Sequence, residues 1–396
     1  MTAVAEVFRP ADPGFLADPY PAYAVLRRDL PVGYDEGVGA WLVSRHAEVS
    51  ALLRDRRFGR VFTPRQLTEV FAAWNRLNAD AMLDMEPPEH TRQRRLVSAA
   101  FTPRRVAALR EPVRRLADRL LDAAVDGDRL ELMSGLAEPL PVAVIAELLG
   151  VPEEDRHRLR PWSRDIVGLY ELAYDDAAER RAVAAAEEFD GYLRWLIADR
   201  RRRPGDDLLS ALVGASDAGD RLTEDEVVAT AVLLLNAGHE ATVNALGNGV
   251  LALLLTPGSL DRLRAEPHLL APAVEEMIRY DTPLSMFQRT AFADVDIAGR
   301  TVRAGERVGL LLGSANRDER AFARPDRFDV SRPDNPHVGF GAGIHYCVGA
   351  PLARLEMQEA VSALLNRFRR LELAGEPVRR PTFQFRGLTG LPLAVG

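Results

Sequence analysis

The sequence lacks lysine, so all 51 of its basic residues are arginines. We interpret this as the codon bias of a GC-rich genome rather than as chemistry. The net charge is −7, which gives no overall positive field for binding nucleic acid or an anionic membrane. No basic-then-apolar leader pattern and no apolar span of membrane length occur near the start. We therefore predict a cytoplasmic protein that binds neither nucleic acid nor membranes.

Cysteine is nearly absent, and Cys347 alone cannot form an intrachain disulfide or a multi-cysteine zinc site. The stretch that contains it reads FGAGIHYCVG and continues as APLARLEMQEAVSALLNRF, with apolar residues at helical spacing. Cys347 should thus lie just before a helix N-terminus, where backbone N–H groups and the helix dipole favour a thiolate. Gly341 and Gly343 allow a tight turn, and Gly349 allows the backbone to approach a flat cofactor closely.

Repeats, low-complexity tracts and Ser/Gly linkers are also missing, which predicts a single domain over 1–396. Helical spacing of apolar residues dominates from about 85 to 280. Short turn-rich segments at 39–44, 295–308 and 381–395 predict brief strands. The clearest helix should begin at the capping box Thr223-Glu224-Asp225-Glu226 and end near Thr256. The expected fold is mostly α with small β-sheets.

The cysteine segment resembles the heme-binding signature of the cytochrome P450 family, F-G-x-G-x-H-x-C-x-G followed by x-x-L-A-R-x-E. The resemblance extends from Asp18-Pro19-Tyr20 to Arg386-Gly387-Leu388 and is of the soluble bacterial, actinobacterial secondary-metabolism type. It implies the P450 fold, with a long central helix over heme b. It also implies that Cys347 is the axial ligand, that Phe340 packs beside the sulfur, and that His345 reaches a heme propionate.

Three further residues match propionate ligands of the family. His90 and Arg94, in EPPEHTRQR, lie four apart on one predicted helical face, whose alternative interpretation is a solvated basic face. Arg289 matches another propionate arginine. The resemblance also implies a buried structural triad, for which the candidates are Glu276, Arg279 and Arg327.

The middle of the long helix, AGHEAT, resembles the family's oxygen-binding groove. Gly238 should leave room over the iron, and a local kink there could accommodate oxygen and water. The family usually has an acid followed directly by threonine, whereas Glu240 is followed by Ala241, with Thr242 one place later. Proton delivery would then pass to Glu240, ordered water or a substrate hydroxyl, or oxygen insertion would not be the outcome.

The resemblance further implies a roomy, mostly apolar substrate pocket with several hydrogen-bonding points. Asn236 lies one turn before Glu240, and it either faces this pocket or bonds to a neighbouring helix. The other expected lining residues are Phe62, Gln66, Phe71, Trp74, Met82, Leu83, Ala237, Leu284, Ser285, Met286, Leu388 and Thr389.

Three functions follow from the resemblance. The first is hydroxylation of a secondary metabolite such as a macrolide, with O2 and with electrons from a ferredoxin and its NAD(P)H-dependent reductase. The second is oxidative coupling or cyclisation of an aromatic or cyclic-dipeptide substrate without oxygen insertion. The third is a non-catalytic heme sensor. We expect a monomer whose ferredoxin docks on the cysteine side, at a basic patch made of Arg92, Arg95, Arg104 and Arg105.

Overall fold

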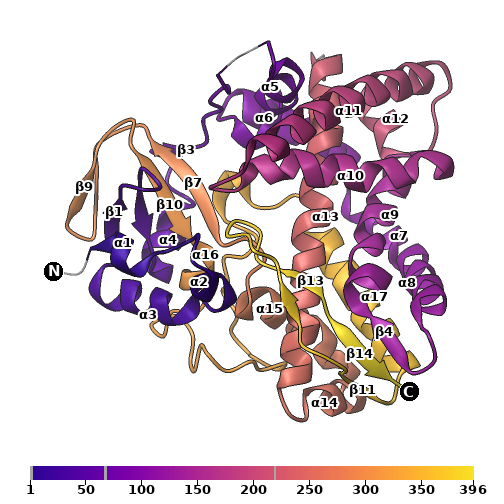
Figure 1. Ribbon diagram of the computed structural model, residues 1–396. Coiled ribbons are helices and arrows are strands. Elements are labelled where there is room, and N and C mark those ends of the chain that lie inside the picture. Colours follow the sequence, from indigo (N-terminus) through magenta and orange to yellow (C-terminus); the bar gives the residue numbers. More distant parts are fainter. Residues whose placement is uncertain (1–2, 67–68, 218–219) are drawn as a thin grey trace. The chain divides into compact units, whose positions relative to one another are not determined.

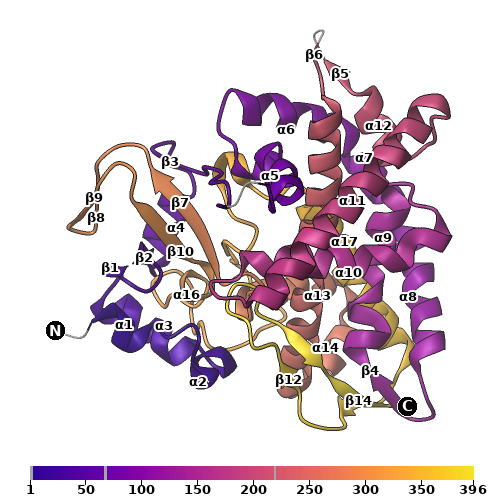
Figure 2. The same ribbon diagram turned by 45° about the horizontal axis from the view of Figure 1, so that its top comes forward.

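The computed structural model describes residues 3–66, 69–217 and 220–396 of the chain and is mostly helical, with small sheets, as predicted (Figures 1 and 2). Its contacts divide the chain into two compact units. Unit 1 comprises 1–59, 110–140 and 241–396, and unit 2 comprises 60–109 and 141–240. A single domain stays a prediction, and we describe each unit by itself.

Unit 1 contains a five-stranded sheet in the order β1-β2-β10-β7-β3. All its pairs are antiparallel except β2 with β10, which are parallel. Apolar side chains such as Val43 and Leu310 are fully buried on it and form one hydrophobic cluster with helix α4. The strands are β1 (Val32–Asp35), β2 (Ala40–Val43), β3 (Phe58–Gly59), β7 (Met286–Ala291) and β10 (Arg307–Leu311).

Smaller sheets complete the β structure of unit 1, and strands β8, β9, β13 and β14 lie within the turn-rich segments predicted to form strands. Strands β11 (Leu371–Leu373), β14 (Pro392–Val395) and β4 (Arg129–Glu131) form a three-stranded sheet. Strand β8 (Val295–Ile297) pairs with β9 (Arg300–Val302), and β12 (Val378–Arg379) pairs with β13 (Leu388–Gly390).

The helices of unit 1 form two groups. Short N-terminal helices and α16 pack near the large sheet, and α17 packs against α8 and α15 (Figure 1). The helices are α1 (Val4–Val7), α2 (Pro13–Ala17), α3 (Tyr20–Asp29), α4 (His46–Leu52), α8 (Arg110–Ala124), the π-helix η2 (Met133–Ala137), α14 (Ser259–Ala265), η5 (Pro267–Leu269), α15 (Leu270–Tyr280), α16 (Leu312–Ala315), η6 (Gly343–His345) and α17 (Ala350–Arg367).

Unit 2 is built around the 27-residue helix α11 (Asp176–Arg202), which packs against α5, α10 and α12. The stacked rings of Trp162 and Phe189, with centroids 5.1 Å apart, join α10 to α11. The other elements are α5 (Ala72–Ala79), η1 (Met82–Asp84), α6 (Glu89–Ala100), α7 (Pro103–Ala108), α9 (Pro139–Leu148), η3 (Glu153–Asp155), α10 (Arg156–Val167), η4 (Gly168–Tyr170), α12 (Leu208–Gly214) and the strand pair β5 (Ser216–Asp217) and β6 (Asp220–Arg221).

Helix α13 (Glu224–Leu255) is the longest helix of the described chain. The predicted capping box is confirmed, because the Thr223 N–H donates to Glu226 Oε2 at 2.8 Å and the Glu226 N–H donates to Thr223 Oγ1 at 3.2 Å. Its residues up to Glu240 belong to unit 2, and those from Ala241 belong to unit 1. The helix is α-helical throughout, so the distortion expected at Gly238 does not occur as a change of helix type.

By length and composition, none of the described helices alone could cross a membrane. One sharply bent pair, α13 with α14, passes that test together.

Candidate functional site

The cysteine loop lies in unit 1 between η6 and α17. The backbone N–H of Cys347 donates to the carbonyl of Phe340 at 3.0 Å and closes the loop. Gly341 and Gly343 have φ angles of 71° and 70°, in the left-handed region that favours glycine. The predicted glycine turn before a helix N-terminus is confirmed, with the half-buried Cys347 just ahead of α17.

A charged cluster supports this loop. The guanidinium of Arg354 lies 4.4 Å from the ring centroid of Phe340 and donates to Tyr346 Oη at 3.1 Å. Arg354 Nε also donates to Glu275 Oε1 at 2.6 Å, and His337 Nε2 lies 3.0 Å from Glu275 Oε2. Burial alone would raise the pKa of Glu275, but hydrogen bonds from Arg354 and His337 lower it to about 2. The ionised Glu275 therefore holds Arg354 and His337 together at the base of the cysteine loop.

Sequence reasoning did not find Glu275 or His337. They lie 62 residues apart, and Glu275 lies 79 residues from Arg354, so no local spacing signals the cluster. Only Arg354 belongs to the motif that was recognised.

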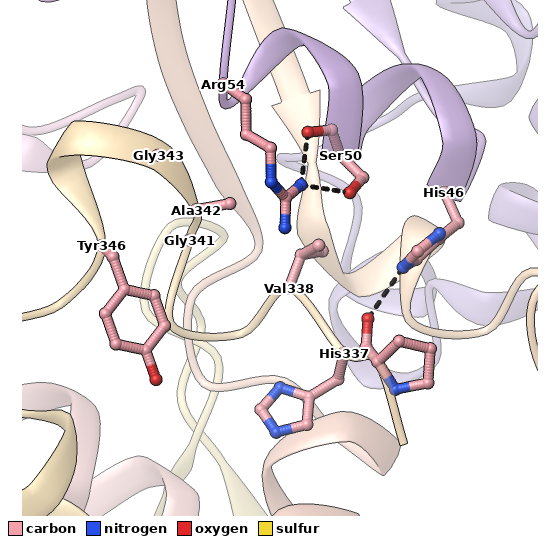
Figure 3. A pocket seen from close by; sticks show the side chains of 10 residues that line it. His46, Ser50, Arg54, His337, Val338, Gly341, Ala342, Gly343 and Tyr346 are labelled. Carbon is pink, nitrogen blue, oxygen red and sulfur yellow. Dashed lines mark hydrogen bonds between the residues drawn. The ribbon is translucent and has the colours of Figure 1, made fainter. Parts of the chain in front are cut away.

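An open hollow of about 420 Å³ adjoins the cysteine loop in unit 1 (Figure 3). Arg54 lines it and donates to the carbonyl of Ser50 at 2.7 Å. His46 Nε2 lies 2.9 Å from the carbonyl oxygen of Pro336. His337 also lines the hollow, and no carboxylate belongs to the described residues that do. The surface beside the loop is therefore basic or neutral.

Two predicted propionate ligands, Arg289 and His345, belong to unit 1. Arg289 is buried on β7, donates to the carbonyl of Gln288 at 2.8 Å, and lies with its guanidinium 5.8 Å from the ring of Phe287. His345 is half-buried at the end of η6. A buried guanidinium and an imidazole are suitable partners for carboxylates.

The other two predicted propionate ligands, His90 and Arg94, belong to unit 2 and lie on α6. His90 is buried and Arg94 is half-buried. Burial lowers the pKa of His90, and the positive charge of Arg94 lowers it further. The two residues are therefore close enough to interact, but their role toward a propionate stays a prediction.

The polar middle of α13 is buried. Glu240 Oε1 lies 3.5 Å from His239 Nε2, and His239 Nδ1 lies 3.1 Å from Ser163 Oγ on α10. A Cβ at Gly238 would lie 3.6 Å from Ile145 on α9, an ordinary contact distance. Gly238 therefore faces α9, and its role in leaving room over the iron stays a prediction.

Asn236 and Thr242, on either side of this segment, are also buried. Neither amide atom of Asn236 meets a hydrogen-bond partner among the described residues. Helix geometry places Asn236 about 160° from Gly238 around the axis, away from the side that contacts α9. Of the two predicted alternatives, the bond to a neighbouring helix is not found.

The other predicted pocket residues divide by burial. Gln66, Ala237 and Thr389 are exposed, and their role as pocket walls stays a prediction. Met286 is fully buried, and its sulfur would lie 2.5 Å from a Cβ at Gly309, which places it within the large sheet. The half-buried or buried residues, whose role as pocket walls stays a prediction, are Phe62, Phe71, Trp74, Met82, Leu83, Leu284, Ser285 and Leu388.

The buried triad is confirmed for two of its three predicted members. Glu276 and Arg279 are fully buried and pair through Arg279 Nε and Glu276 Oε2 at 2.7 Å. The third member is Arg332, whose Nε lies 2.9 Å from Glu276 Oε2. The prediction of Arg327 is wrong, because its side chain is exposed and only its backbone carbonyl faces the cluster, where it accepts from Arg332 at 2.8 Å.

The predicted basic patch in unit 2 is partly neutralised. Arg92 pairs with Glu226 and lies 3.6 Å from Asp220, so its charge is already compensated. Arg105 lies 3.9 Å from Asp206. Arg92 therefore does not suit the predicted role in docking an acidic partner.

Comparison with known proteins assigns the family. The family model described as Cytochrome P450 matches residues 172–392. The chain is 46% identical to the cytochrome P450 monooxygenase PikC of Streptomyces venezuelae, over 96% of this chain and 91% of PikC. The chain therefore belongs to the cytochrome P450 family and is a monooxygenase-family enzyme.

Two other relatives support this assignment. The chain is 37% identical to the polyketide biosynthesis cytochrome P450 PksS of Bacillus subtilis, over 98% of both chains. The crystal structure of P450BioI in complex with hexadec-9Z-enoic acid ligated acyl carrier protein matches with a TM-score of 0.92 and 40% identity. That match covers 97% of this chain and 100% of P450BioI. The predicted P450 fold is confirmed.

The cofactor of this family is heme, iron protoporphyrin, and the residues around Cys347 fit it. A Cβ at Gly349 would lie 3.8 Å from Cys347 Sγ, an ordinary contact distance, so this glycine lies directly beside the sulfur. A thiolate at the N-terminus of α17 is a suitable axial ligand for heme iron. The buried Arg289 adds a cation in the same unit.

Proposed function

We propose that this enzyme hydroxylates a polyketide-like secondary metabolite, such as a macrolide, and that it works in the cytoplasm as a monomer. The main observation behind a heme-thiolate oxidation is the cysteine loop, which the charged cluster beneath it holds in place. Bound heme supplies oxygen activation in one-electron steps. Cys347 would hold the iron, while the Phe340, Arg354 and Glu275 cluster fixes the loop that presents the sulfur.

The buried amide of Asn236 supports a substrate with hydrogen-bonding groups. Burying an amide without a partner costs about 1–3 kcal/mol, which a ligand hydroxyl or carbonyl would recover on binding. Polyketides carry such groups on an otherwise apolar skeleton. The name of PksS, a polyketide biosynthesis enzyme, points the same way.

Ala241 keeps a second function open. With no hydroxyl at this position, the protons would come through Glu240, ordered water or a hydroxyl of the substrate itself. An enzyme that delivers protons slowly to the bound oxygen is also suited to oxidative coupling or cyclisation. In these reactions hydrogen is removed and no oxygen is inserted. Glu240 and the unpaired Asn236 on the same helix argue against a sensor that never turns over.

We assign electron supply to a ferredoxin and its reductase. The hollow beside the cysteine loop supports this, because Arg54 lines it without a carboxylate among the described residues. Such a surface would attract an acidic carrier and raise the association rate at low salt. The docking site would thus include residues that the predicted patch did not.

Two experiments test the proposal. Cys347→Ser is expected to abolish the thiolate-type band of the reduced carbon-monoxide spectrum, and survival of that band would rule out Cys347 as the ligand. To identify the reaction, labelled oxygen gas is supplied with the substrate that neighbouring biosynthetic genes suggest. The molecular mass of the product is then measured by mass spectrometry. Incorporated label supports hydroxylation, whereas an unlabelled dimer or ring product supports the coupling alternative.

A further inference from the structure

A row of aromatic rings crosses unit 2 from a buried position on α10 to the surface of α11. The ring centroids of Trp162 and Tyr192 are 5.6 Å apart, and those of Tyr192 and Trp195 are also 5.6 Å apart. Trp162 and Tyr192 are buried, whereas Trp195 is 54% exposed. These distances lie within the usual contact range of aromatic pairs, so an electron can pass along the row from the surface to the interior.

The inner end of the row adjoins the polar middle of α13. Ser163 follows Trp162 on α10, and its Oγ lies 3.1 Å from His239 Nδ1. His239 Nε2 in turn lies 3.5 Å from Glu240 Oε1. All these residues belong to unit 2. The row therefore leads from the surface toward the segment that resembles the family's oxygen-binding groove.

Each buried ring of the row has a carboxylate at its ionisable hydrogen. The indole N–H of Trp162 donates to Glu188 Oε2 at 2.8 Å, and the hydroxyl of Tyr192 donates to Asp155 Oδ2 at 3.0 Å. An oxidised tryptophan or tyrosine is a strong acid, and a carboxylate within hydrogen-bond reach can accept its proton. Burial and the hydrogen bond to Asp155 raise the pKa of Tyr192, so the phenol keeps its proton until it is oxidised.

The positive charge beside the rings favours neutral radicals. The Arg158 guanidinium lies 4.5 Å from the ring centroid of Trp162 and 5.3 Å from that of Tyr192. A cation is attracted to a neutral ring but opposes a second positive charge on it. Oxidation of either ring therefore depends on release of its proton to the neighbouring carboxylate. Packing of α10 against α11 requires neither these carboxylates nor an exposed tryptophan.

We propose that Trp162, Tyr192 and Trp195 form a radical-transfer chain, which carries electrons inward when peroxide oxidises the heme in the absence of substrate. Trp162 loses an electron, with its proton to Glu188, and regains both when Tyr192 supplies the next electron. Tyr192 passes its own proton to Asp155 and is restored by Trp195, which a soluble reductant such as ascorbate reduces. Two such cycles, with the two electrons and two protons of one ascorbate, reduce one peroxide to two waters.

This chain protects the enzyme from oxidising itself, and it depends on the family's heme but not on the proposed substrate. For the test, the holoenzyme is mixed with hydrogen peroxide without substrate and frozen rapidly. Electron paramagnetic resonance should then show a tyrosyl radical, and mass spectrometry of the peptides should find oxidised Trp195. Tyr192→Phe keeps the ring but has no phenolic proton, so it should lower both signals about threefold or more. Ascorbate should suppress both signals in the parent.

Tyr34→Phe is the matched control in unit 1. Tyr34 is 45% exposed, and its ring centroid lies 5.5 Å from that of Trp41. The indole N–H of Trp41 donates to Glu306 at 2.9 Å, so this pair also combines an exposed ring with a carboxylate. Tyr34→Phe should change neither signal. Both variants should keep the parent's reduced carbon-monoxide spectrum, which verifies that the heme site is intact.

Two outcomes overturn the inference. One is oxidation of Trp195 in Tyr192→Phe equal to the parent's. The other is a loss of the radical signal in Tyr34→Phe as large as that in Tyr192→Phe, which would indicate attack by radicals from solution. Failure of the proposed function is separate, since it would show as an unlabelled product when the parent turns over its substrate.

Discussion

Glu276 and the asparagines of α13 are buried polar groups of two opposite kinds. Glu276 is bonded to Arg279 and Arg332, as well as to backbone, at distances below 3 Å. Asn236 and Asn244 are also buried, but their amides meet no partner among the described residues. A saturated cluster has no hydrogen-bonding capacity left for a ligand. The contrast separates polar groups that hold the fold from those that remain available to water or substrate.

The largest effect is expected where a saturated cluster is broken. Glu276→Gln should lower the free energy of unfolding by about 3–5 kcal/mol, because it leaves buried guanidinium groups without their counter-charge. Urea unfolding of the holoenzyme measures this. Glu111→Gln is the matched control, since Glu111 pairs with Arg114 at the same spacing but about half-exposed, and should change stability by less than about 0.5 kcal/mol. Equal losses of unfolding free energy in both variants would show that Glu276 does not have the proposed structural role.

A second comparison tests which arginine completes the cluster. Arg332→Met removes a buried partner of Glu276 and should cost about 2–4 kcal/mol in the free energy of unfolding. Arg327→Met removes an exposed side chain and should cost less than about 0.5 kcal/mol. The reverse order in urea unfolding would restore Arg327 as the third member.

The cluster under the cysteine loop should show a pH dependence. The pKa of Glu275 falls from its ordinary value of 4.5 to about 2 in the folded protein. Its stabilisation is therefore present above about pH 4.5 and is lost as the pH falls toward 2. Glu275→Gln should cost about 2 kcal/mol at pH 7 and flatten the fall of stability in this window.

The control for this pH effect is Glu372→Gln, which removes an exposed carboxylate lying 3.1 Å from Arg370. Its stability should follow the parent's at every pH. If Glu275→Gln shows the same acid-induced loss as the parent, the ion pair with Arg354 does not stabilise the fold.

The smallest expected effect on stability is at Asn236. Asn236→Leu removes an unpaired buried amide and should leave the free energy of unfolding unchanged or raise it by up to about 1 kcal/mol. Asn78→Leu is the matched change in unit 2, because Asn78 bonds to Tyr170 and to the carbonyl of Trp74, both at 2.8 Å. It should cost about 1–2 kcal/mol. A comparable loss for Asn236→Leu would indicate that its amide supports the fold.

Features written within a short stretch of sequence were predictable. The capping box of α13 and the glycine turn at Cys347 each depend on residues a few positions apart, and both are found. The third arginine of the triad was not predictable in this way. Arginines are frequent here, with Arg332 only five residues after Arg327, and the path of the backbone decides which side chain faces Glu276.

Contacts between residues far apart in the sequence could not be predicted at the site. Helical spacing places Asn244 and Asn248 on one face but cannot tell that Asn248 meets Arg379 from 131 residues away. It also cannot tell that Gly387 excludes any side chain beside Asn244. Which polar group is paired depends on segments that only the folded chain brings together.

The first turn of α13 sets the direction of every later side chain on the helix. Thr223 and Glu226 fix the residue at which the helix starts, and each later residue turns by about 100°. One residue inserted after Glu226 would swing Asn236 by about 100° and bring Leu235 close to its direction. The helix cap therefore decides which side chain takes the direction of Asn236, and with it which side chain would face the proposed substrate.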